Sequence, residues 1–116
     1  MHEFSIVQGL IQQIEEYLKR ENYKKVLKIN LEIGDLSGVV KEALEFAYDV
    51  CSKGTSIEGA QLKISRVPVK ARCDKCYNEF FVEDYCFLCP DCGGIGLKIL
   101  SGRELKIKEM EVDDGD

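Results

Sequence analysis

The chain has 116 residues, of which 45% are hydrophobic and 32% are charged, and its formal net charge is −5. This length suits one compact domain with a small metal-stabilised lobe, but hardly two independent hydrophobic cores. No apolar run approaches the roughly 20 residues that cross a bilayer, and no signal peptide is recognisable, so we expect a soluble, cytoplasmic protein without a membrane partner. The acidic charge also argues against nucleic acid as a partner.

The first half of the chain predicts a helix, a strand and a second helix. Over the first twenty residues, apolar side chains recur at the helical steps of three and four: Phe4, Val7, Ile11, Ile14 and Leu18. Apolar and polar residues then alternate, which predicts a half-buried strand ending at Gly34, with Leu27, Ile29, Leu31 and Ile33 on its apolar face. A second helix is expected from Val40 to Cys51, with an apolar stripe formed by Val40, Leu44, Ala47 and Cys51.

The second half predicts two strands separated by a cysteine-rich insertion. Leu62 and Ile64 begin the first of these strands, and Pro68 indicates an edge position or a bulge. The second strand runs from Leu105 to Val112. The fold class is therefore α+β, with two helices packed on a three-stranded sheet and an inserted zinc-ribbon-like lobe. Residues 1–69 plus 103–116 are expected to form the α+β domain, and residues 70–102 the zinc-binding lobe.

Five of the six cysteines fall within residues 73 to 92, and this crowding favours a metal site over a disulfide framework. Two Cys-x-x-Cys pairs separated by twelve residues predict one tetrahedral zinc held by four thiolates: Cys73, Cys76, Cys89 and Cys92. Cys86 and Cys89 have the same spacing and are an alternative second pair. We favour Cys89 with Cys92, because Pro90 and Gly93 suit a metal-binding turn.

The remaining cysteines, Cys86 and Cys51, are expected to be small buried side chains. A closed four-cysteine site leaves no coordination position for water or substrate, so the zinc is expected to be structural. The sequence contains no catalytic Ser–His or His–Cys pairing and no phosphate-binding glycine loop, and we do not expect an enzyme.

The amino terminus Met1-His2-Glu3 carries the only histidine of the chain. A histidine beside a chain end is ordinarily an exposed, frayed residue. Here, however, an α-amine, backbone amides, an imidazole and a carboxylate lie within three residues at the start of a predicted helix. Such donors can close chelate rings on one ion, and a tetragonal nitrogen set suits Ni(II) or Cu(II) better than zinc or magnesium.

With these features in place, the sequence resembles the HypA family of hydrogenase maturation factors, which are nickel metallochaperones. The resemblance spans nearly the whole chain. It rests on Met1-His2-Glu3 with Ser5, the strand ending at Gly34 followed by Leu36-Ser37, the Glu58-Gly59 turn before Leu62, the four cysteines, and the closing strand Leu105 to Val112.

The resemblance implies that His2 is the essential nickel ligand, that the Met1 amine and neighbouring backbone nitrogens complete a planar site, and that Glu3 assists binding or transfer. It implies transient Ni(II) cargo beside structural Zn(II). It also implies delivery to the [NiFe]-hydrogenase large subunit together with the GTPase HypB, and in some members service to urease maturation proteins. Whether the chain forms a homodimer is left open. The chain departs from the family pattern in its extra Cys86, and it has no second histidine to supply another imidazole.

A competing hypothesis is a zinc-ribbon adaptor that mediates protein interactions without delivering metal. Residues 70–103 contain five basic and five acidic residues, so this segment has no basic bias. An adaptor of this kind would therefore bind protein in preference to nucleic acid.

Overall fold

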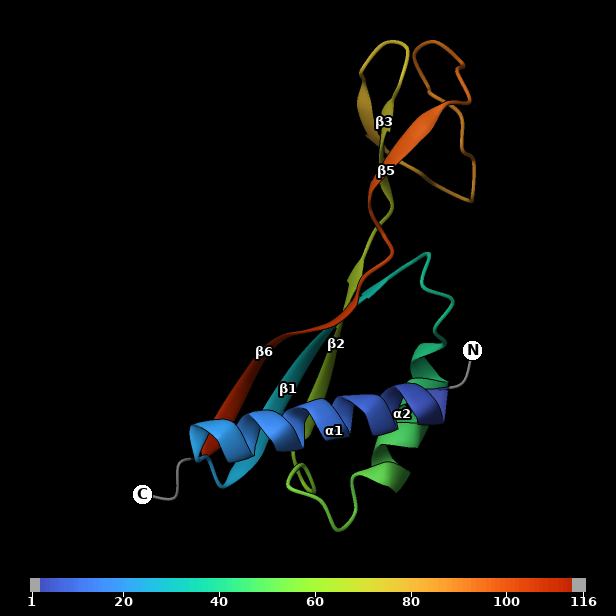
Figure 1. The fold of residues 1–116 in the computed structure, drawn as a ribbon. Helices are drawn as coiled ribbons and strands as arrows, with labels where there is room; N and C mark the ends of the chain where they lie inside the picture. The colour runs from blue at the N-terminus through green and yellow to red at the C-terminus, as the bar shows by residue number, and fades with distance from the viewer. Residues whose placement is uncertain (1–2, 114–116) are drawn as a thin grey trace. The chain divides into compact units, whose positions relative to one another are not determined.

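The computed structural model describes residues 3–113 and confirms the predicted α+β class with two helices (Figure 1). No helix in this part of the chain is both long and apolar enough to cross a membrane. The elements follow in the order α1 (Glu3–Glu21), β1 (Lys25–Gly34), α2 (Lys41–Cys51), β2 (Gln61–Val67), β3 (Lys70–Cys73), β4 (Glu79–Phe81), β5 (Leu97–Ser101) and β6 (Leu105–Asp113).

The strands form two three-stranded sheets, with the orders β2-β1-β6 and β4-β3-β5. In the second sheet, β3 is antiparallel to both of its neighbours. The described residues divide into two compact units, of which the first comprises 3–31, 38–64 and 107–113, and the second comprises Glu32–Ser37 and Ser65–Lys106. The division into a nickel-binding domain and a zinc-binding lobe stays a prediction about function.

The core of the first unit is made by α1, α2, β1 and the loop after α2. The middle of each predicted apolar stripe is buried, whereas Phe4, also expected on the stripe of α1, is 43% exposed. The buried residues of the helices are Val7, Ile14 and Leu18 in α1, and Leu44, Ala47 and Tyr48 in α2. The internal cavity lined by α1, α2, β1, β2 and this loop measures only about 10 Å³. This core is therefore filled by its own side chains and offers no room for a ligand.

Polar contacts fasten the loop after α2 to the two helices. The hydroxyl of Tyr48 is buried and donates a hydrogen bond to the carbonyl of Ala60 at 2.9 Å. Burial, with a smaller effect from the nearby charge of Asp49, raises the pKa of Tyr48 to about 12. From α1, the Glu15 carboxylate accepts hydrogen bonds from the backbone N–H (3.1 Å) and the hydroxyl of Ser56.

The predicted alternation is wrong at the start of β1. Leu27 is 46% exposed, whereas Val26 and Asn30 are buried although they lie on the opposite face of the strand. β1 is the central strand of its sheet, with β2 and β6 along its two edges, and each of its faces carries buried side chains. Asn30 Nδ2 donates a hydrogen bond to Glu109 on β6 at 3.4 Å, as is usual for a buried polar side chain.

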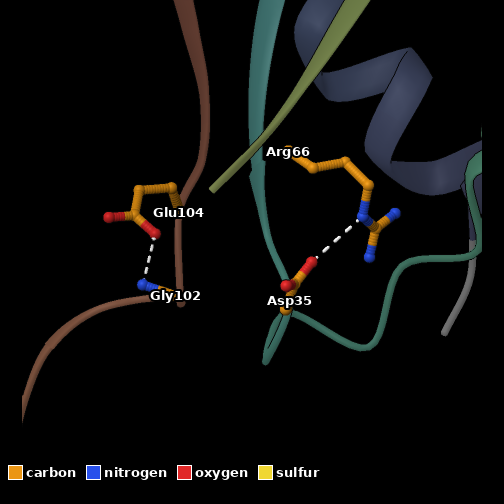
Figure 2. A network of polar contacts seen from close by, with 4 residues as sticks. All are labelled: Asp35, Arg66, Gly102 and Glu104. Atoms are coloured by element: carbon orange, nitrogen blue, oxygen red, sulfur yellow. Dashed lines mark hydrogen bonds and ion pairs between the residues drawn. The ribbon is translucent and has the colours of Figure 1, made fainter. Parts of the chain in front are cut away.

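In the second unit, chain segments far apart in sequence meet around Gly34 and Gly102. The Gly34 N–H donates to the carbonyl of Glu104 at 2.7 Å, and a Cβ on Gly34 would lie 2.1 Å from the carbonyl carbon and oxygen of Gly102. Figure 2 shows the polar contacts at this place: Arg66 pairs with Asp35 at 3.0 Å, and the Glu104 carboxylate accepts the N–H of Gly102 at 2.7 Å. Only glycine fits at position 34.

Candidate metal centre

The first cysteine pair lies where β3 ends and the chain turns back. Cys73 is the last residue of β3, and its carbonyl accepts the N–H of Tyr77 at 3.0 Å to close the turn. Tyr77 takes a left-handed φ of 62°, and the N–H of Lys75 donates to the Cys73 sulfur at 3.4 Å. The backbone therefore turns around the sulfur of Cys73 and brings Cys76 to the same side.

The second pair lies on a turn of the same kind before β5. The carbonyl of Cys89 accepts the N–H of Gly93 at 2.9 Å, and the Cys89 N–H donates to the carbonyl of Gly94 at 3.0 Å. Gly93 has a φ of +71°, a conformation that glycine adopts without strain. The two turns lie side by side at the ends of β3 and β5 (Figure 1), joined by the Asp74 N–H bond to the Gly96 carbonyl at 2.9 Å.

The four sulfurs of these turns form one compact cluster. All four Sγ atoms lie within 4.8 Å of one another, and the Cys73–Cys92 and Cys76–Cys89 pairs are each 3.5 Å apart. A disulfide would require about 2.05 Å. Four sulfurs at about 2.3 Å from a tetrahedral zinc are separated by roughly 3.8 Å. The spacing therefore fits a shared metal ion and excludes disulfides within these pairs.

The electrostatics of the cluster also favour a cation. N–H groups of Cys76 and then Lys75 lower the pKa of the Cys73 thiol, and the N–H of Cys92 lowers that of Cys89 to about 7. In Cys76 and Cys92 an N–H likewise favours the thiolate, but the neighbouring sulfurs together with desolvation outweigh it, and the pKa of both thiols is raised. Four adjacent thiolates thus need a positive charge between them, which a divalent metal supplies.

The cluster is covered on one side and open to solvent on the other. Cys73 and Cys89 are buried, while Cys76 and Cys92 are exposed. A Cβ on Gly94 would lie 3.3 Å and 3.4 Å from the sulfurs of Cys92 and Cys73. The spacing of the cysteines does not indicate this contact of Gly94 with the sulfurs. The arrangement is a closed set of four soft ligands, typical of structural zinc.

Cys86 is not part of the cluster among the residues that the structure describes. The expectation that it is buried is wrong, because its side chain is exposed. Asp84 and Tyr85 adopt left-handed φ values of 52° and 57°, and the Cys86 N–H closes this turn onto the Glu83 carbonyl at 2.9 Å. The turn places residues 83–88 outside the β4-β3-β5 sheet, and no buried side chains cover the thiol of Cys86 there. Cys51 is half-buried.

Of the three residues expected to hold nickel, Met1 and His2 lie outside the described residues. Glu3 is the first residue of α1, and its carboxylate accepts a hydrogen bond from the N–H of Val40 at 3.3 Å. Val40 was expected on the buried stripe of the second helix, but it precedes that helix as its N-cap and is 55% exposed.

Comparisons with known proteins agree on one family. Residues 1–112 match the sequence model of the family described as "Hydrogenase/urease nickel incorporation, metallochaperone, hypA". The hydrogenase maturation factor HypA of Geobacter metallireducens is 46% identical over 113 residues, covering 97% of this chain and all of the relative. The HypA of Nostoc sp. is 43% identical over 98% of this chain and 97% of its own.

A solved structure is similar to this chain in both fold and sequence. The solution structure of the nickel metallochaperone HypA from Helicobacter pylori matches with a TM-score of 0.72 and 25% identity, covering 97% of this chain and 98% of that one. The resemblance seen in the sequence is thereby confirmed. A family match that covers nearly the whole chain and a four-thiol cluster of metal-binding geometry lead to one conclusion: the chain belongs to the HypA family of hydrogenase maturation factors, which are nickel-incorporation metallochaperones.

Proposed function

We propose that this chain binds Ni(II) at its amino terminus and delivers it during the maturation of [NiFe]-hydrogenase. The proposed ligands are the His2 imidazole, the Met1 amine and neighbouring backbone nitrogens, and Glu3 assists binding or transfer. The observation that carries the proposal is the family match, which begins at residue 1 and therefore includes Met1-His2-Glu3. The proposed step is a transfer of metal between ligand sets, in which no bond of an organic substrate is broken.

The proposed role of Cys73, Cys76, Cys89 and Cys92 is to hold structural Zn(II). Support comes from the sulfur spacing and from the donor set, because four thiols fill the four positions of a tetrahedral zinc. When bound, zinc supplies folding free energy to a lobe with little apolar core of its own. The same logic assigns residues 1–69 plus 103–116 to nickel binding and residues 70–102 to zinc binding.

The proposed partners are HypB as the GTPase and the hydrogenase large subunit as the acceptor, with urease maturation proteins as a further destination and a homodimer as a further assembly. They are supported by the names of the matching relatives, which are hydrogenase maturation factors, and by the family description, which mentions urease. Delivery of nickel to the hydrogenase large subunit during its maturation in the cytoplasm would place the chain in the cytoplasm.

Titration calorimetry with Ni(II) on the untagged wild type and on His2→Ala tests the proposal. We expect one nickel per wild-type chain and a loss of that site in the variant, with the zinc content unchanged. Equal nickel affinity and stoichiometry in the two proteins would contradict nickel binding at the terminus and favour the zinc-ribbon adaptor.

A further inference from the structure

The second unit carries a surface hollow that the sulfur cluster does not use. The hollow measures about 210 Å³ and is lined by residue 35, by residues between 66 and 69, and by residues between 82 and 87. A water molecule takes up about 30 Å³, whereas pockets for cofactors and other small molecules measure about 300–1,000 Å³. The size of the hollow therefore suits a single side chain of another molecule.

The charges that line the hollow leave one carboxylate without a counter-ion. The Nε atom of Arg66 lies 3.0 Å from the carboxylate of Asp35, so these two charges match each other (Figure 2). Within residues 3–113, the side chain of Asp84 has no ion pair and no hydrogen bond, and the same holds for its neighbour Glu83. The unmatched charge is therefore negative and favours a cationic occupant.

Two aromatic side chains form another part of the lining. Tyr85 is 76% exposed and Phe87 is 36% exposed, and within residues 3–113 no lysine or arginine lies over either ring. Elsewhere in the same unit, the exposed ring of Phe81 already has the Nζ atom of Lys70 at 5.8 Å from its centroid. A cation is attracted to the face of an aromatic ring, and arginine makes this contact more often than lysine. The two rings are thus available to a cation from outside the chain.

The backbone holds the carboxylate and one of the rings in an uncommon conformation. Asp84 and Tyr85 both have left-handed φ values, of 52° and 57°. Aspartate tolerates this region, but a bulky residue such as tyrosine rarely adopts it. The segment is fixed at its start, where the N–H of Val82 donates to the carbonyl of Val69 at 2.9 Å. Backbone conformations of this kind persist where the surrounding structure enforces them, and they are frequent at binding sites.

We propose that this hollow binds an arginine side chain of a partner protein. The planar guanidinium stacks on the ring of Tyr85 or Phe87 and donates hydrogen bonds to the Asp84 carboxylate, a combination that its flat shape and several N–H groups allow. Charge complementarity selects this occupant, because an acidic side chain would be repelled by Asp84 and finds Arg66 already paired with Asp35. The site recognises a partner and takes no part in nickel binding.

A pair of peptides that differ only in charge tests the site. The probe is acetyl-Gly-Ser-Arg-Ser-Gly-amide, and its control has citrulline in place of arginine, which keeps the planar head group but is neutral. Both are titrated into the zinc-loaded wild type and followed by amide NMR. We expect the arginine peptide to shift the signals of residues 83–87 with a dissociation constant on the order of 1–10 mM, because one side chain makes few contacts. The citrulline peptide should bind about tenfold more weakly or not at all.

Matched variants assign the binding to the residues of the hollow. Asp84→Asn removes the charge but keeps a residue that tolerates left-handed φ, and it should weaken binding of the arginine peptide by about tenfold. Tyr85→Ala should weaken it by about threefold, whereas Tyr85→Phe keeps the ring and should stay within about twofold of the wild type. Glu83→Gln is the control, because it removes a neighbouring carboxylate that does not line the hollow, and it should also stay within about twofold. An unchanged zinc content shows that each variant keeps its fold.

Four outcomes would overturn the proposal. The arginine peptide could leave residues 83–87 unshifted, or the citrulline peptide could bind as tightly, which would make the hollow an apolar groove. An equal loss in Glu83→Gln and Asp84→Asn would show a general attraction by acidic residues. Self-association of the wild type that is lost in Asp84→Asn, measured by sedimentation, would assign the hollow to a second copy of the chain.

Discussion

Replacing Cys89 with serine should cost the protein its zinc and unfold the lobe around it. In the segment Ser65–Lys106 the buried side chains are Val69, Ala71, Cys73 and Cys89, so two of the four are themselves in the sulfur cluster. Burial of one valine and one alanine contributes roughly 2–4 kcal/mol. A structural zinc site contributes roughly 10–16 kcal/mol. The metal therefore outweighs apolar burial in this lobe several-fold, and loss of one buried thiolate removes most of its stabilisation.

Cys86→Ser is the matched control for this substitution. Its thiol is exposed and lies outside the cluster, so this variant should keep one zinc per chain, whereas Cys89→Ser should retain close to none after dialysis against a weak chelator. Metal analysis gives the stoichiometry. In amide NMR spectra of Cys89→Ser, the signals of residues 70–102 should lose their dispersion, while those of α1 and α2 stay at their wild-type positions. Zinc loss in Cys86→Ser equal to that in Cys89→Ser would refute the assignment of the second pair.

Three further predictions concern stability and acidity. Tyr48→Phe removes the hydrogen bond to Ala60 and should lower the free energy of unfolding by about 1–2 kcal/mol in urea titrations at pH 8. Because the pKa of Tyr48 is raised to about 12, its hydroxyl ionises first in the unfolded chain, so stability should fall between pH 10 and 12 more steeply in the wild type than in this variant. Equal slopes would contradict the buried hydroxyl. Gly34→Ala places a Cβ 2.1 Å from the backbone of Gly102 and should cost about 3 kcal/mol, measured by thermal or urea unfolding. Gly9→Ala is the control, because its new Cβ would have no atom within 4 Å, and it should leave the free energy of unfolding unchanged or raise it by up to ~1 kcal/mol. Equal losses of stability in the two variants would argue against the close approach at Gly34. The pKa of Cys89 is lowered to about 7 by the Cys92 N–H, so zinc uptake by the metal-free protein should be favoured above pH 7 and weaken as protons compete below it. A zinc affinity that does not change between pH 8 and pH 5, measured by competition with a chelator, would contradict thiolate ligation.

The order of helices and strands could be predicted because most of the elements have one buried face. The steps of three and four in α1 and α2 identified Val7, Ile14 and Leu44 correctly as core residues. The alternation of apolar and polar residues failed at Leu27, because it separates the two faces of a strand but does not show which part of each face the rest of the fold covers. The helical spacing failed for Val40 because it does not show where a helix begins.

Other features depend on contacts that no local pattern encodes. The strands β3, β4 and β5 are three to five residues long and are defined by pairings such as that of Arg72 with Glu79 and Lys98. The spacing of the cysteines indicated their clustering because each two-residue gap forms its own turn. The exposure of Cys86 and the bond from Val40 to Glu3 arise only when distant segments are assembled.

Metal analysis of the untagged protein, purified with and without added nickel, tests the account most directly. We expect one zinc per chain in every preparation of the wild type and of His2→Ala, and one exchangeable nickel in the nickel-treated wild type only. Nickel bound equally by His2→Ala, or nickel that displaces the zinc from the four cysteines, would contradict the separation of a nickel-binding terminus from a structural zinc site.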